Sequence, residues 1–100
     1  MKATFNKTII AEATKEELIY IEGNWYFPPS AVNQELLLSS PTAYTCPWKG
    51  VCTYYNVVVG DQTADDCAWS YDNPLPTAID QVKKDFTAYI AFYRDVEVGE

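Results

Sequence analysis

Three side chains capable of chemistry stand close together near the middle of the chain: the thiol of Cys46, the indole of Trp48 and the amine of Lys49. Pro47 lies between them and Gly50 follows, so a residue that fixes the backbone and one that frees it frame the stretch. We therefore expect a tight turn here, or a close approach to another part of the backbone. The residue types allow thiol chemistry or the binding of a ligand by a cation among aromatic rings.

Thiol chemistry at Cys46 is the first hypothesis. A free cysteine has a pKa of about 8.5, which a nearby cation lowers. Lys49 stands three residues on and favours the thiolate if the turn folds it back, whereas in an extended strand the two side chains face opposite sides. A buried cysteine that packs as a small hydrophobe is the competing interpretation. Cys46 is thus the candidate nucleophile or redox group of an enzyme.

Binding of a small molecule is the second hypothesis. Aromatic walls and one fixed positive charge suit a small planar or anionic ligand. The competing interpretation places the aromatic rings in the core and the lysine along a strand or at a turn tip. The residues that we expect at such a site are Lys49, Trp69, Tyr71, Tyr54, Cys46 and Trp48.

A metal site or carboxylate catalysis has little support. The three cysteines are spaced C-x5-C-x14-C, and the chain has no histidine. Structural zinc needs four nitrogen or sulfur ligands, usually in close pairs. The doublets 16–17 and 65–66 are adjacent carboxylates that diverge in a strand, and 65–66 is expected in a solvated turn. We therefore expect no metal and no cofactor.

Composition sets the broad class. The chain has 100 residues, 48% of them hydrophobic, so we expect one domain, residues 1–100, with a modest core. A net charge of −7 repels phosphate backbones and disfavours nucleic-acid binding. No apolar run approaches the roughly 18 residues of a membrane span, and the first residues lack the apolar core of a signal peptide. With an odd number of cysteines, a soluble cytoplasmic protein is expected. The oligomeric state stays open.

Short β-rich segments separated by turn residues predict a mainly β domain of about seven strands with one or two short helices. The stretch from Val51 to Val59 is apolar on both faces and is expected at the centre of a sheet. Trp25 to Phe27 is a possible strand edge, to which a partner could add a strand. The other expected strands are 8–13, 17–22, 42–48, 62–71, 89–93 and 96–98, and the expected helices are 31–38 and 77–86.

Several motifs resemble one family. Cys-Pro-Trp-Lys-Gly is followed after a short gap by two tyrosines, Ala-Trp-Ser-Tyr comes before a proline, and Ala-Phe-Tyr stands near the end. In this order they resemble the bacterial domain-of-unknown-function family 427. Cys52 departs from the resemblance, because a small residue such as alanine is usual there. The matching segments are 26–28, 46–50, 54–55, 68–74 and 91–93.

The resemblance implies a compact Mss4-like (β-tent) fold with an aromatic-lined cleft. That type of scaffold carries metal-binding, redox and ligand-binding proteins, so it assigns no function by itself. The chain has no Gly-Ser doublet with paired aspartates and no P-loop spacing, which leaves nucleotidyl transfer without support. The leading hypothesis is a small-molecule-binding domain with one key lysine, Lys49. The alternatives are a thiol-dependent enzyme or redox protein that uses Cys46, and a protein-interaction module.

Overall fold

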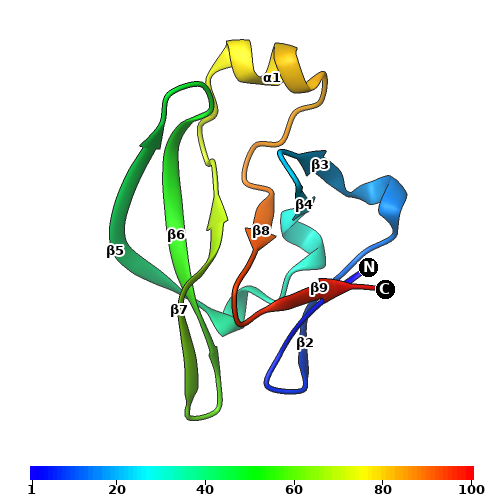
Figure 1. The fold of residues 1–100 in the computed structure, drawn as a ribbon, viewed down its shortest axis with the longest axis vertical. Helices are drawn as coiled ribbons and strands as arrows, with labels where there is room; N and C mark the ends of the chain where they lie inside the picture. The colour runs from blue at the N-terminus through cyan, green and yellow to red at the C-terminus, as the bar shows by residue number, and fades with distance from the viewer.

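The computed structural model describes residues 1–100, which form two antiparallel sheets and one short α-helix (Figure 1). The six-stranded sheet runs in the order β3 (Ile19–Ile21), β4 (Asn24–Phe27), β8 (Ile90–Phe92), β7 (Gln62–Ser70), β6 (Gly50–Val59) and β5 (Leu37–Cys46). The three-stranded sheet has the order β2 (Thr8–Glu12), β1 (Lys2–Phe5) and β9 (Glu97–Gly99). The helix is α1 (Pro76–Val82), and three 3-10 turns span Lys15–Glu17, Pro29–Ala31 and Gln34–Leu36. The mainly β class is confirmed.

Successive side chains of the large sheet enter two different hydrophobic clusters. In β4, Tyr26 lies in one cluster and Phe27 in the other. Their cross-strand partners in β8, Ala91 and Ile90, separate in the same way. This follows from the two-residue period of a strand. At β4 and β8 the sheet is therefore buried on both faces.

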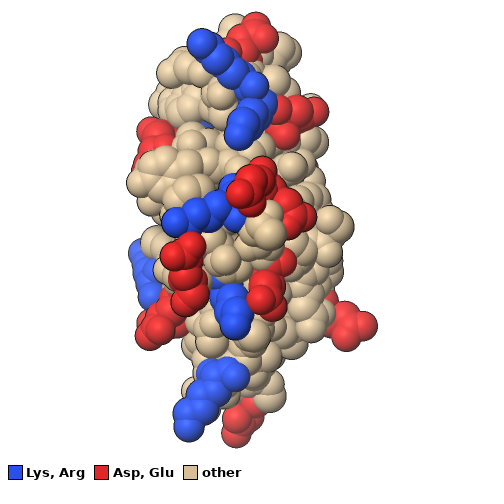
Figure 2. Space-filling view, turned by 90° about the vertical axis from the view of Figure 1, so that its right-hand side faces the viewer, with Lys and Arg blue, Asp and Glu red and all other residues tan.

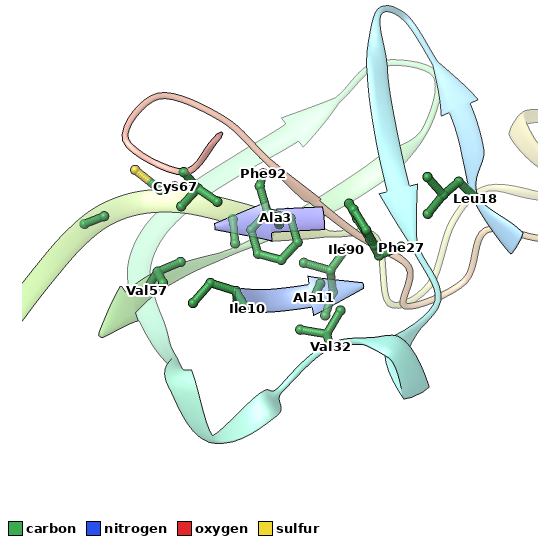
Figure 3. Close-up of a cluster of buried hydrophobic side chains, with 13 residues drawn as sticks. Ala3, Ile10, Ala11, Leu18, Phe27, Val32, Val57, Cys67, Ile90 and Phe92 are labelled. Atoms are coloured by element: carbon green, nitrogen blue, oxygen red, sulfur yellow. The ribbon is translucent and has the colours of Figure 1, made fainter. Parts of the chain in front are cut away.

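The first cluster joins the two sheets. Ala3 of β1 and Ile10 and Ala11 of β2 pack with residues of the large sheet that include Phe27 and Phe92 (Figure 3). The rings of Phe27 and Phe92 meet edge to face, with centroids 5.7 Å apart. The packing of Ala3, Ile10 and Ala11 in this cluster fixes the small sheet, and with it both chain ends, against one face of the large sheet.

The second cluster covers the opposite face and includes Cys46, with Trp48 packed against it. It includes Ala78 of α1 and Phe86 from the segment after that helix. Phe86 is completely buried, and its ring meets the edges of Tyr26 and Tyr71. The complete set of buried members is Ile19, Ile21, Tyr26, Cys46, Cys52, Tyr71, Ala78, Phe86 and Ala91.

The prediction of a helix over 31–38 is wrong. Two 3-10 turns lie there instead, and β5 begins at Leu37. The Asn33 side chain accepts a hydrogen bond from the amide of Glu35, which favours a short turn over a continuous helix. The second predicted helix is present but ends at Val82, because Lys83 takes a left-handed conformation with a φ of +66°.

Strand positions also differ in places. The strand Lys2–Phe5 was not expected, and it pairs with both β2 and β9. The interpretation of Trp25 to Phe27 as an open edge is wrong, because β4 lies between β3 and β8. The edges of the large sheet are β3 and β5. The strand predicted over 51–59 is confirmed as β6, which is paired on both sides.

Charged residues are mixed on the surface. On the face shown in Figure 2, basic and acidic side chains are interspersed, with no continuous basic area. The chain carries seven basic and fourteen acidic residues in total. None of the helices combines the length and the apolar character needed to cross a bilayer.

Candidate functional site

The motif at residues 46–50 closes the hairpin between β5 and β6. Cys46 pairs with Gly50, and Pro47, Trp48 and Lys49 form the turn between them. Gly50 has a φ of +112°, which residues with a Cβ rarely adopt. The expected turn is therefore confirmed, and glycine is required where it re-enters the strand.

The same turn contacts the loop before α1. The amide of Leu75 donates a hydrogen bond to the carbonyl oxygen of Lys49 at 2.9 Å. A Cβ added to Gly50 would lie 3.5 Å from the carbonyl oxygen of Asn73. The backbone of the motif is thus held by pairing within the hairpin and by a hydrogen bond from a neighbouring loop. The Cα positions of the turn residues are fixed as a result.

The side chain of Lys49 is buried although it comes from a turn. It is 7% exposed, and its Nζ lies 2.5 Å from Oε1 of Glu22, whose side chain is 56% exposed. Glu22 stands in the turn between β3 and β4. Because β3 and β5 are the two edges of the large sheet, this ion pair bridges the hairpins at its opposite edges.

Two aromatic rings flank the buried ammonium. Nζ of Lys49 lies 5.1 Å from the ring centroid of Trp48 and 5.1 Å from that of Tyr71. Both distances are within the range of a cation–π interaction. Trp48 is partly exposed, whereas Tyr71 is buried. One wall of the site therefore belongs to the core and the other reaches the surface.

The charge state of the site follows from its contacts. Burial by itself lowers the pKa of Lys49, but the hydrogen bond with Glu22 and the nearby Tyr26 raise it more, so the net pKa lies above the ordinary value. Burial raises the pKa of Tyr71 and of Tyr26. At neutral pH the site holds one ammonium, paired with the Glu22 carboxylate, among neutral hydroxyl groups.

Trp69 and Tyr54 lie on the same face of the large sheet as Lys49 but do not flank its ammonium. They are cross-strand partners, and their ring centroids are 6.5 Å apart. The indole N–H of Trp69 donates a hydrogen bond to the hydroxyl oxygen of Tyr26 at 3.0 Å. Trp69 and Tyr54 both pack against the second cluster, and Tyr26 links Trp69 to the surroundings of Lys49. The structure thus groups the six expected residues on one face, with Lys49, Trp48 and Tyr71 in closest association.

The cysteines divide between the two clusters. Cys46 and Cys52 are buried in the second cluster and Cys67 in the first. Burial raises the pKa of Cys52 and of Cys67, which disfavours their thiolates. No group of three or more cysteine, aspartate or glutamate side chains is arranged to hold a metal ion.

Two hollows are present on the surface, and neither contains Lys49 or an aromatic ring. One, of about 170 Å³, lies beside β9, and the other, of about 250 Å³, lies beside Asp66. Asp66 was expected in a solvated turn, which is wrong: it lies within β7 and accepts a hydrogen bond from the hydroxyl of Thr42 at 2.7 Å. The space around Lys49 is filled by its own neighbours.

Sequence reasoning missed two members of this site. Glu22 is 27 residues from Lys49, and nothing in its immediate sequence marks it among fourteen acidic residues. Tyr26 appeared only within a matching motif and a possible strand edge, not as a site residue. A buried ammonium requires a compensating partner, but the sequence left open whether Lys49 is buried, so nothing in it indicated that a partner exists. The identity of that partner depended on the tertiary structure, which brings the two edge hairpins into contact.

Comparison with curated proteins found no match. A family model described as a domain of unknown function (DUF427) matches residues 1–99, and the chain belongs to that family.

Proposed function

We propose that this domain binds a small molecule with a negatively charged group, which is held by Lys49 and rests against the ring of Trp48. The observation that carries the proposal is the environment of the ammonium group. It is buried between two aromatic rings, and its one ion-pair partner is a side chain that stays largely in solvent. A fully structural ion pair would gain more from a partner that is buried and held by further hydrogen bonds.

The surroundings support an anionic ligand. The molecule has a net charge of −7, so an anion meets an unfavourable average field. Lys49 supplies a local positive charge within this negative field, since its ammonium stays protonated and the buried hydroxyl groups near it stay neutral. Aromatic faces beside a cation also favour a planar ligand, whose ring can stack while its charged group meets the ammonium.

The test is a binding screen with a matched control. Small carboxylates, phosphates and planar neutral compounds are titrated into the wild type, Lys49→Met and Lys84→Met, with ligand-observed NMR and tryptophan fluorescence as readouts. Both variants lose one positive charge, but Lys84 is exposed and forms no ion pair. We expect anions to bind the wild type and Lys84→Met and to lose binding to Lys49→Met. Equal binding to all three proteins, or none to a folded wild type, would overturn the proposal.

A further inference from the structure

The turn that carries Glu22 is an unusual place for this residue. Glu22 and Gly23 connect β3 to β4, and both have positive φ angles, of 51° and 86°. Two-residue hairpin turns with positive φ at both positions favour Asn-Gly or Asp-Gly, because a longer side chain gains no local hydrogen bond and its Cβ is strained. Local conformation therefore does not explain glutamate here.

The reach of its side chain does provide an explanation. Glu22 extends from the turn to Lys49 and places a carboxylate oxygen 2.5 Å from Nζ. Because more than half of the Glu22 side chain is exposed, this carboxylate meets the buried ammonium from the solvent side. A carboxylate from outside the protein that replaced the Glu22 carboxylate would reach the ammonium by the same route.

We infer that Glu22 is a built-in competitor that occupies the position of a ligand carboxylate, and that the ligand is a small aromatic carboxylic acid. This inference rests on the proposed function and adds to it the ligand class and the means of control. The ligand carboxylate replaces that of Glu22 on Lys49, and the ligand ring lies on the partly exposed face of Trp48. Binding then requires that the Glu22 side chain swing into solvent, which its exposure permits.

The competitor is weak enough to be displaced. Hydration of the exposed Glu22 carboxylate and the entropy of its side chain offset part of the attraction in this ion pair. A tethered group nevertheless competes at its effective concentration, so the affinity for an external carboxylate is reduced. Removal of the competing charge should therefore tighten binding by roughly threefold to tenfold.

The experiment compares benzoate with its uncharged counterpart benzamide by tryptophan fluorescence and NMR. The proteins are the wild type, Glu22→Gln, Glu22→Asn and Glu16→Gln. Asparagine is well suited to the positive φ of this turn, so Glu22→Asn keeps the test valid if glutamine perturbs folding. Glu16 is exposed and forms no ion pair, so Glu16→Gln controls for the change in net charge.

We expect benzoate to bind both Glu22 variants at least threefold more tightly than the wild type, to bind Glu16→Gln like the wild type, and benzamide to show no gain. The inference would be overturned if both Glu22 variants bound benzoate no more tightly than the wild type does, in titrations that extend to the solubility limit of benzoate. An equal gain in Glu16→Gln would also overturn it, since the effect would then be one of net charge. Failure of the proposed function is a separate outcome. It would be seen if no compound in the wider screen bound in a way that depends on Lys49.

Discussion

Lys49 and Glu22, 27 residues apart in the chain, form an ion pair in which the ammonium is buried and the carboxylate is exposed. The pair bridges the two edge hairpins of the six-stranded sheet. Removal of the carboxylate and removal of the ammonium should change the free energy of unfolding by different amounts. Loss of the carboxylate leaves a charge in a low-dielectric position, whereas loss of the ammonium returns an exposed carboxylate to water.

This asymmetry predicts the order of two stability effects. Glu22→Gln should lower the free energy of unfolding by about 1–2 kcal/mol, because the buried ammonium keeps its rings but loses its counter-charge. Lys49→Met should cost less, about 0–1 kcal/mol, because an apolar chain of similar length fills the same space. Urea denaturation of both variants measures the difference. A Lys49→Met variant much less stable than Glu22→Gln would show that the attraction, and not the burial of charge, dominates.

Alkaline pH should destabilise the protein through this site. The folded-state pKa values of Lys49, Tyr26 and Tyr71 are all raised. A raised folded pKa contributes stability that is fully present below the unfolded pKa and is lost as pH rises through the folded value. Thermal midpoints should therefore fall above about pH 10, where these groups titrate in unfolded chains. In Glu22→Gln the fall should be shallower, because the hydrogen bond that raises the folded-state pKa of Lys49 is weakened while burial, which lowers it, remains. Identical pH profiles for the two proteins would contradict this explanation.

Gly50, at the start of β6, should be less replaceable than Gly60, which follows the end of that strand. Gly50→Ala forces a Cβ onto a backbone with a φ of +112° beside the loop before α1, and should cost about 1–3 kcal/mol. Gly60→Ala is the matched control, since its φ of +60° is in the left-handed region and a Cβ there meets open space. Its expected cost is about 1 kcal/mol. Chemical denaturation gives both values, and a larger loss for Gly60→Ala would contradict the conformational assignment at the motif.

The cysteines should react slowly in the native protein. All three are buried, and burial raises the pKa of Cys52 and Cys67. Alkylation with iodoacetamide, followed by mass spectrometry at graded pH, should give far slower labelling than in urea at every position. Rapid labelling of Cys46 near neutral pH would instead favour the hypothesis of a thiol-dependent enzyme.

The sequence was sufficient for features with local causes. Pro47 and Gly50 predicted the turn that holds Lys49, and the β-rich stretch at residues 51–59, apolar on both faces, predicted β6. The prediction of a helix over 31–38 was wrong because the spacing of Val32, Leu36 and Leu37 fits two structures equally well. It fits one face of a helix, and it also fits turns followed by a strand. Short apolar runs do not separate these possibilities.

Contacts across the sheet had no such local signal. Glu22 meets Lys49 only because the large sheet brings its edge hairpins together, and Tyr26 and Phe27 divide between two clusters only because the sheet is covered on both faces. The edge interpretation of Trp25 to Phe27 failed for a related reason, since β8 arrives from a segment more than sixty residues later in the chain. Long-range pairing of this kind depends on the whole topology.

The most direct test of the account observes the lysine itself. With lysine labelled with 13C at Cε, the Lys49 signal can be assigned by its loss in Lys49→Met and followed while benzoate is added at neutral pH. We predict a saturable shift of the Lys49 signal, at lower benzoate concentration in Glu22→Asn than in the wild type, with the five other lysine signals nearly unchanged. A Lys49 signal that stays constant in both folded proteins, or that shifts no more than those of the exposed lysines, would contradict the claim that this ammonium is a binding site for a carboxylate.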